Sequence, residues 1–294
     1  MTAALQDFET YLIHEKRASK NTYLSYIRDL AQFEQYILGQ GVTELADVSM
    51  DQVDAYLQKL RDEGKANATI IRTAAALKCF YNRLVLQGVI EESPVRHEKQ
   101  KRQPAKIPEV LTPAEVTLLL SQPKCVDVKG YRDRAMLELL YATGMRVTEL
   151  VSLNIEDVNI DLGFVRCASD GRERIIPLYP AAIDSIRNYI NRARRIMLLS
   201  PEEHSLFVNV NGERMTRQGF WKLIKHYAAL ANIKKDITPH TLRHSFAVHL
   251  LENGADLHSV QELLGHADAS STQVYASLVK GKIKNIYDKA HPKA

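Results

Sequence analysis

Apolar residues recur every three or four positions through the first 90 residues of the chain, which is the spacing of one buried face of an α-helix. Each of four such stripes predicts one helix. Ser19 and Ser49 precede the second and third stripes, where a side-chain oxygen can cap the first free backbone N–H groups. Gly88 lies where the fourth helix should end. The stripes are Leu5, Phe8 and Leu12; Tyr23, Ile27, Leu30 and Ile37; Val53, Tyr56, Leu57 and Leu60; and, from about Asn67, Ile70, Ala74, Leu77, Tyr81 and Leu84.

The helical pattern stops at Ser93-Pro94 and begins again after Pro108. The stretch between them is basic and bracketed by prolines, which is typical of a linker between domains. Thr112 and Pro113 then suit the N-cap and the first position of a new helix. We therefore expect a helical domain over residues 1–92, a basic linker over 93–108 and a second domain over 109–294.

The second domain has a mostly helical pattern with one β interruption. Residues 164–167 and 174–178 have the composition of short strands, and an Asp-Gly turn signal at 170–171 lies between them. Helices are expected over 181–197 and 217–231, and again from Thr238. The predicted fold class is mainly α: a helical N-terminal domain, then a mixed α/β, mostly helical domain with a small β-hairpin or sheet.

Composition is that of an ordinary globular protein, with 45% hydrophobic and 25% charged residues. No apolar run approaches the roughly 18 residues that span a bilayer, and the N-terminus lacks the basic and apolar regions of a signal peptide. Cys79, Cys125 and Cys167 are odd in number and far apart, which fits neither a disulfide framework nor a zinc site. We expect a cytoplasmic protein with no membrane partner.

Positive charge gathers in two clusters, although the net charge of +4 is only mildly basic. Basic patches of this kind neutralise DNA phosphates and release counterions; the alternative for either cluster is solvated surface. The clusters are Arg96, Lys99, Lys101, Arg102 and Lys106, with Glu98 as the one acid between residues 94 and 106, and Arg192, Arg194 and Arg195.

A phosphate site is indicated at the helix that Thr238 and Pro239 begin. His240 and Arg243 lie three apart in its first turns and share a face, where free backbone N–H groups favour an anion. The apolar residues Leu242, Phe246 and Leu250 lie on the opposite side and should be buried. His240 and His244 also have the spacing of a zinc pair, but no Glu follows His240 and no third ligand is evident, so no metal is expected.

Two further segments carry polar residues at breaks between helices. Arg146 follows a glycine break at Gly144, and Glu149, one turn later, is placed to orient its guanidinium. Gly265 is predicted to cap the C-terminal end of a helix and to present His266 at a turn, and Tyr275 follows nine residues after His266. Each residue alone is more often structural than functional.

Taken in order, these motifs resemble those of the tyrosine recombinases, a family that includes phage-type integrases and the Xer enzymes that resolve chromosome dimers. The resemblance covers nearly the whole chain: the N-terminal helices look like the family's core-binding (SAM-like) domain, and the rest looks like its catalytic domain. A Thr22-Tyr23, Asp29-Leu30 and Phe33 pattern is most similar to that of Xer enzymes. The motifs are Gly144-x-Arg146-x-x-Glu149-Leu150, His240-x-x-Arg243-His244, Leu264-Gly265-His266 and Tyr275.

The resemblance implies a covalent mechanism. Arg146 and Arg243 would clamp the non-bridging oxygens of the scissile phosphate, and His266 would hold the phosphate. Tyr275 would attack phosphorus to give a 3′-phosphotyrosyl link and a free 5′-hydroxyl, with His240 as its proton acceptor or hydrogen-bond partner. Because the link conserves the bond energy, rejoining needs no ATP, and no cofactor or metal is expected.

The β-hairpin turn departs from the family pattern. The family places a Lys there, in a Gly-Lys-Gly-type sequence, to protonate the leaving 5′-oxygen. This chain has Ala168-Ser169-Asp170-Gly171-Arg172, about one residue shorter and without a Lys. Arg172 or Arg174 could approach the leaving oxygen, but an Arg gives up its proton poorly. The general acid is therefore not assigned.

Duplex DNA is the expected partner. The resemblance implies four protomers on two sites, as a homotetramer or as a heterotetramer with a second recombinase, and a DNA translocase is a further candidate. The C-terminal tail would dock on a neighbouring subunit or pack on its own domain. The expected DNA contacts are Thr22, Arg72, Lys78, Lys99, Lys101 and Arg102.

Three other functions fit parts of the pattern. The missing hairpin Lys would suit a DNA-binding relative with impaired cleavage, although such a protein has no need of the whole catalytic set. A type IB topoisomerase shares the chemistry, but the N-terminal domain resembles recombinases more. Among recombinases, a mobile-element integrase is the alternative to a Xer-like role, which we favour because no extra arm-binding domain precedes the first helices.

Overall fold

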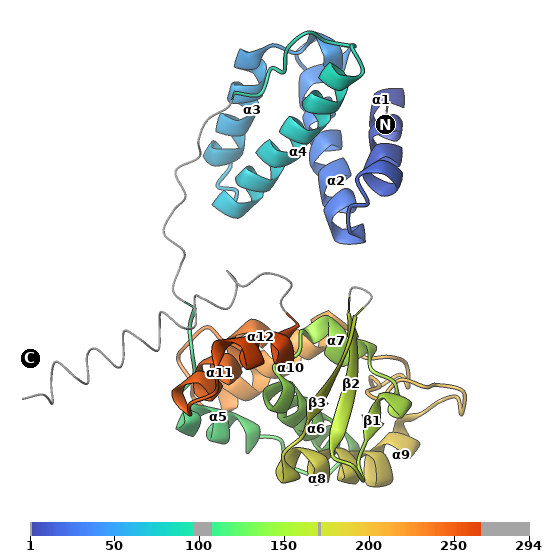
Figure 1. Ribbon diagram of the computed structural model, residues 1–294, viewed down its shortest axis with the longest axis vertical. Helices are drawn as coiled ribbons and strands as arrows, with labels where there is room; N and C mark the ends of the chain where they lie inside the picture. The colour runs from blue at the N-terminus through green and yellow to red at the C-terminus, as the bar shows by residue number, and fades with distance from the viewer. Residues whose placement is uncertain (1, 97–107, 170–171, 266–294) are drawn as a thin grey trace, which may run out of the picture. The chain divides into compact units, whose positions relative to one another are not determined.

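The computed structural model describes residues 2–96, 108–169 and 172–265. The chain forms two compact units that divide between Gln103 and Pro104, and each is described by itself. Figure 1 labels the elements of both. Helices dominate the two units and a small antiparallel sheet lies in the second, so the predicted fold class is confirmed.

Helices make up the N-terminal unit, and two of them start at the predicted caps. Ser19 accepts a hydrogen bond from the backbone N–H of Thr22, and Ser49 forms a capping box with Gln52. Gly88, with φ of +70°, follows the last helix. The elements are α1 (Ala3–Thr10), a π-helical turn (Tyr11–Glu15), α2 (Lys20–Leu38), a 3₁₀ turn (Leu45–Asp47), α3 (Met50–Asp62) and α4 (Asn67–Leu86).

The four apolar stripes of this unit meet in one core. Phe8, Phe33 and Phe80 are almost fully buried, and Phe8 meets Phe80 edge to face with ring centroids 5.3 Å apart. Tyr81 is buried as well, and its hydroxyl donates to the Leu45 carbonyl at 3.0 Å. That bond fixes the 3₁₀ turn against α4.

The C-terminal unit begins with the predicted cap, because Thr112 and Glu115 form a capping box with Pro113 in the first turn. Its central helix, α6, is buried on nearly every side. The elements are α5 (Pro113–Leu120), α6 (Val128–Thr143), α7 (Val147–Ser152), a 3₁₀ turn (Ile155–Asp157), β1 (Val158–Asn159), β2 (Phe164–Ser169), β3 (Arg172–Pro177), α8 (Pro180–Tyr189), a π-helical turn (Ile190–Arg194), α9 (Arg195–Met197), α10 (Arg217–Leu230), α11 (Pro239–Glu252) and α12 (Leu257–Leu264).

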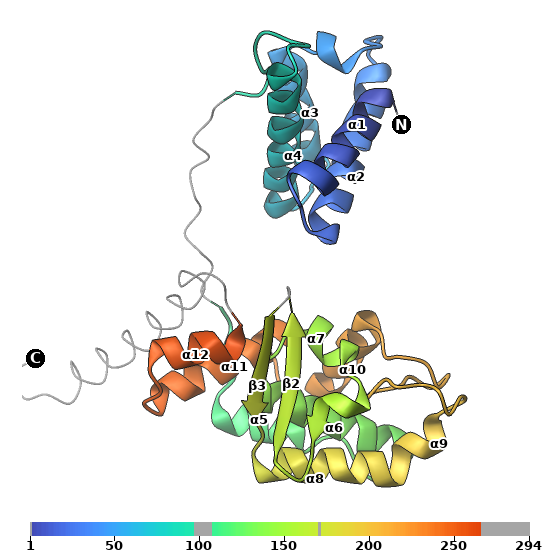
Figure 2. The ribbon, with the colours of Figure 1, turned by 45° about the vertical axis from the view of Figure 1, so that its right-hand side comes forward.

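The sheet has the order β1-β2-β3, with both pairs antiparallel. Cys167 pairs with Arg174 and Arg166 pairs with Ile175. Since successive side chains of a strand point to opposite faces, Cys167 and Arg174 share the face that contains buried Val165, whereas Arg166 and Ile175 share the other. β3 packs on α6, and Figure 2 shows β2 and β3 side by side in front of that helix.

Three features of this unit differ from what the sequence alone indicates. The helix expected over 181–197 is α8, a π-helical turn and α9 in succession. The two-residue strand β1 was not predicted, because two residues carry no detectable alternation. Arg194 does not belong to a surface cluster: it is 6% exposed, and its guanidinium donates to the carbonyls of Glu203 and Ser205 at 2.7–3.0 Å.

Candidate active site

The break between α6 and α7 positions Arg146. Gly144 ends α6 with φ of +58°, a left-handed conformation that glycine adopts without strain. Arg146 then becomes the N-cap of α7. The buried Glu149 accepts hydrogen bonds from the Arg146 backbone N–H at 2.6 Å and from its Nη1 at 3.2 Å. The carboxylate therefore holds both the backbone and the guanidinium of this residue.

Helix α11 supplies His240 and Arg243. Thr238 caps it by accepting from the Thr241 N–H, and Pro239 occupies the first turn. His240 is exposed, whereas Arg243 is only 4% exposed. The Arg243 guanidinium donates to the Gly144 carbonyl at 2.6 Å and to the Leu264 carbonyl at 2.7 Å. These bonds tie α11 to the C-terminal ends of α6 and α12.

The C-terminal end of α12 is where three arginines meet. Three successive backbone carbonyls accept from them: Leu263 from Arg174 Nε at 2.9 Å, Leu264 from Arg243 Nη2 at 2.7 Å, and Gly265 from Arg146 Nη2 at 3.5 Å. A helix leaves its last four carbonyls without partners inside the helix. The arginines satisfy the carbonyls of Leu263, Leu264 and the C-cap Gly265, and cations are favourable at this negative end of the helix dipole.

Arg174, from β3, is a member of this cluster that sequence reasoning missed. We had considered it as a group near the leaving oxygen; its Nη1 and Nη2 instead donate to the Glu149 carboxylate at 3.1 and 2.8 Å. The two residues lie 25 positions apart, so no local spacing signals the contact. The signal available in the sequence is the alternation of side chains between the two faces of β3, because it places Arg174 on the buried face of the sheet.

Desolvation and neighbouring charges together set the protonation of Glu149 and His240. Burial raises the pKa of Glu149, but hydrogen bonds from Arg174 and the Arg146 N–H outweigh it and keep that pKa below its usual value. Although part of the His240 side chain is exposed, neighbouring protein atoms displace water from its imidazole, and this desolvation, followed by the charges of Arg243 and Arg146, lowers the pKa of His240. At neutral pH Glu149 is therefore ionised and His240 is neutral, which is the form that can accept a proton.

Three of the five expected catalytic residues, Arg146, His240 and Arg243, lie together. Both arginines are close enough to His240 to affect its pKa. His266 and Tyr275 lie outside the described residues, as do Asp170 and Gly171 of the hairpin turn. Gly265, which directly precedes His266, has φ of +64° and ends α12 at the arginine cluster.

Three of the six residues expected to contact DNA lie in the described part of the N-terminal unit. Thr22 and Lys78 are exposed, and the Thr22 hydroxyl lies 2.8 Å from the Ser19 hydroxyl. Arg72 makes a two-pronged ion pair with the buried Asp29, with both N–O distances at 2.8 Å. This bond fixes Arg72 between α4 and α2. The remaining three, Lys99, Lys101 and Arg102, lie outside the described residues.

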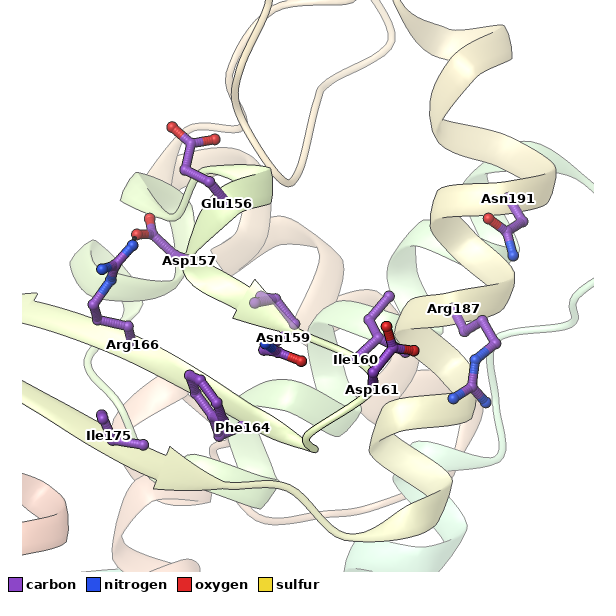
Figure 3. Close-up of a pocket in the computed structure, with 11 residues that line it drawn as sticks. Glu156, Asp157, Asn159, Ile160, Asp161, Phe164, Arg166, Ile175, Arg187 and Asn191 are labelled. Atoms are coloured by element: carbon purple, nitrogen blue, oxygen red, sulfur yellow. Dashed lines mark ion pairs between the residues drawn. The ribbon is translucent and has the colours of Figure 1, made fainter.

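A cavity of about 720 Å³ lies on the opposite face of the sheet (Figure 3). Its lining includes Arg166 and Ile175, which point away from the face that carries Arg174. Arg166 pairs there with Asp157 at 3.7 Å. None of the motif residues lines this cavity, so it is separate from the arginine cluster.

Neither a metal site nor a membrane span is found in the part of the chain that the structure describes. Within residues 2–96, 108–169 and 172–265, no three His, Cys, Asp or Glu residues are grouped so as to hold a metal ion. No helix in these ranges combines the length and the apolar character needed to cross a bilayer. The three cysteines are free thiols.

Solved structures with a similar fold are recombinases. XerH bound to palindromic difH substrate superposes with a TM-score of 0.75 at 21% identity, covering 97% of this chain and 84% of that one. A lambda integrase (75–356) dimer bound to a COC′ core site gives a TM-score of 0.70 at 19% identity, covering 94% of each chain. At this identity the likeness establishes the shared fold.

Comparison of sequences finds relatives at higher identity than these solved structures. Two proteins described as tyrosine recombinase XerD are similar over the full length. The one from Oceanobacillus iheyensis is 44% identical over 294 residues, or 99% of each chain, and the one from Staphylococcus haemolyticus is 41% identical over 295 residues, or 100% of each. Residues 5–88 match the phage integrase N-terminal SAM-like domain, and residues 109–281 match the phage integrase family. These matches confirm the expected resemblance: the chain belongs to the phage integrase family, that of the tyrosine recombinases.

Proposed function

We propose that Tyr275 attacks a DNA phosphate held by Arg146, Arg243 and His266, and that strands are exchanged through the resulting 3′-phosphotyrosyl link. The chain is a DNA strand-transferring site-specific recombinase by its family. The observation that carries the proposed roles is the convergence of Arg146, Arg243 and His240 at the ends of α6, α11 and α12.

The geometry suits this chemistry. A phosphoryl group gains negative charge on its non-bridging oxygens at the transition state, and arginines fixed in advance stabilise that charge without rearranging. Hydrogen bonds to Glu149 and to helix-end carbonyls fix Arg146 and Arg243. A neutral His240 would accept the proton of the Tyr275 hydroxyl as the oxygen attacks phosphorus. As the bond from Tyr275 to phosphorus forms, the P–O5′ bond breaks and the leaving 5′-oxygen takes a proton from solvent or from the unassigned general acid. In the rejoining step a 5′-hydroxyl attacks phosphorus and Tyr275 leaves with its proton restored.

We further propose a Xer-like role, the resolution of chromosome dimers during cell division in the cytoplasm. Full-length similarity to proteins described as XerD supports it. The proposed assembly is a tetramer on two DNA sites, formed by this chain alone or with a second recombinase, and a DNA translocase is a candidate activator. The partner DNA is supported by neighbours solved on recombination sites.

The test uses a nicked suicide duplex that carries the cognate site, with wild type, Tyr275→Phe and Tyr131→Phe. Tyr131 is a partly exposed tyrosine on α6 and serves as the matched control. The expected result is a denaturant-stable protein–DNA adduct with wild type and Tyr131→Phe, and none with Tyr275→Phe. An adduct that persists in Tyr275→Phe would refute the assignment of the nucleophile. Tight, salt-sensitive binding without an adduct, even after a partner recombinase is added, would favour a non-cleaving DNA-binding protein.

A further inference from the structure

Arg174 reaches the arginine cluster from the middle of a strand. It lies on β3 opposite Cys167 of β2, and its side chain is only 14% exposed. All three of its guanidinium nitrogens have partners: Nε donates to the Leu263 carbonyl, and Nη1 and Nη2 donate to Glu149. The side chain therefore connects the sheet, α7 and the end of α12.

Glu149 is shared between two arginines. Its Oε1 accepts from Arg174 Nη1 at 3.1 Å and from Arg146 Nη1 at 3.2 Å. Its Oε2 accepts from Arg174 Nη2 at 2.8 Å and from the Arg146 N–H at 2.6 Å. Because Arg174 occupies both oxygens with a planar fork, it sets the orientation of the carboxylate that in turn orients Arg146.

The end of α12 is shaped to receive this guanidinium. A Cβ atom at Gly265 would lie 2.7 Å from Arg174 Nη1 and 3.0 Å from its Cζ. A side chain at that position would displace Arg174, so the guanidinium packs over the bare backbone of Gly265. The same backbone leads directly into His266.

We propose that Arg174 is a positioning residue, which locks Glu149 and the C-terminal end of α12 together and thereby fixes Arg146 in its phosphate-binding orientation. This inference rests on the proposed function, since it concerns the group that would hold the scissile phosphate. Arg174 is not the proton donor to the leaving oxygen, because its guanidinium stays charged and its nitrogens are bonded to protein groups.

The charged groups around Glu149 allow the positioning role of Arg174 to be measured through the pKa of Glu149. The groups that face it are Arg146 on α7, Arg174 on β3 and the Cys167 thiol on β2, with Arg243 of α11 acting on that thiol. Burial raises the pKa of Glu149, and the hydrogen bond from Arg174 is the largest influence that lowers it. Without Arg174 the pKa of Glu149 should rise, and the carboxylate should lose its charge at mildly acidic pH.

The first experiment measures single-turnover adduct formation by full-length protein at saturating DNA, from about pH 5 to pH 9. The variants are Arg174→Met, Arg174→Lys, Glu149→Gln, the double variant Arg174→Met with Glu149→Gln, and a control, Arg194→Met. Arg194 is another buried arginine, and its hydrogen bonds to described residues go to the backbone carbonyls of Glu203 and Ser205. Arg174→Met should form the adduct about ten- to a hundredfold more slowly, since a misplacement of about 1 Å in a catalytic group can cost about a hundredfold in rate. Its DNA affinity should stay close to that of wild type.

The pH profile separates positioning from simple loss of structure. In Arg174→Met the acid limb should move to higher pH. Arg174→Lys should move it back towards wild type because a positive charge is restored. Adding Glu149→Gln to Arg174→Met should cancel the shift and leave the part of the limb that comes from protonation of His240. Arg194→Met should leave the profile unchanged. An unshifted limb in Arg174→Met, or a shift of equal size in Arg194→Met, would overturn the inference.

A second measurement does not depend on cleavage. The side-chain carboxyl carbon of Glu149 is titrated by ¹³C NMR in DNA-free protein and assigned by its loss in Glu149→Gln. A higher pKa in Arg174→Met than in wild type supports the inference, and an equal pKa overturns it. If wild type forms no adduct, the proposed function fails by itself and this titration still decides the role of Arg174.

Discussion

Replacing Gly144 by alanine should destabilise the C-terminal unit strongly. Gly144 has φ of +58°, and an L-residue with a Cβ pays about 1–2 kcal/mol in that conformation. A Cβ built there would also lie 2.3 Å from Cδ1 and 2.8 Å from Cε1 of Phe246, a buried ring. Relieving that overlap requires repacking, which costs about 1–3 kcal/mol. The expected loss in the free energy of unfolding is therefore about 2–5 kcal/mol.

Urea denaturation followed by tryptophan fluorescence measures this loss. Trp221, on α10, is the one tryptophan of the chain, so its signal reports the C-terminal unit. With a urea m-value of about 3 kcal/mol/M, a loss of about 3 kcal/mol lowers the midpoint by about 1 M. Gly254→Ala is the matched control, because Gly254 has φ of +90° but nothing within 4 Å of a built Cβ.

The two variants separate backbone strain from steric overlap. Gly254→Ala bears the strain alone, so Gly144→Ala should lose clearly more stability. Equal losses would refute the argument from the Phe246 contact. A loss below about 0.5 kcal/mol in Gly144→Ala would contradict both parts of the reasoning.

Two further predictions concern charge. Asp29→Asn should lower the stability of the N-terminal unit by about 1–3 kcal/mol, because Asp29 is 3% exposed and holds Arg72 through two bonds of 2.8 Å. Urea denaturation followed by circular dichroism should then show an earlier transition, while the midpoint measured by Trp221 fluorescence stays constant. An unchanged circular-dichroism curve would contradict this prediction. Burial, then His240 and Arg243, lower the pKa of His244 to about 4. The unfolded chain, with a pKa near 6.5, then binds more protons than the folded chain between pH 6.5 and 4, so stability should fall as pH drops through that window. His244→Gln should lose less stability between pH 7 and pH 5 by Trp221 fluorescence, and identical losses would count against this.

Local signals allowed much of the fold to be predicted. Ser19, Ser49, Thr112 and Thr238 all cap helices as expected, because a cap is decided by residues within one turn. The Arg146–Glu149 contact is equally local, at a spacing of three residues. Glycines with positive φ end α6 and α12 where the sequence placed breaks.

Contacts between distant segments could not be predicted. Arg174 meets Glu149 and Leu263 across 25 and 89 positions, and no periodicity links them. Arg194 looks like a surface residue in the sequence, but carbonyls of an irregular segment surround it. Charged residues are usually exposed, so their burial is decided by tertiary partners that a pattern does not specify.

The three arginines at the end of α12 recognise main-chain carbonyls of Leu263, Leu264 and Gly265 rather than side chains. Every amino acid offers the same carbonyl, so this part of the site does not depend on the side chains at 263 and 264 beyond their packing. What it requires is that the helix stop at the right residue. Gly265 meets that requirement through its positive φ and its lack of a Cβ. The residue at which α12 ends thus determines which carbonyls the three arginines bind, and a single glycine sets that residue.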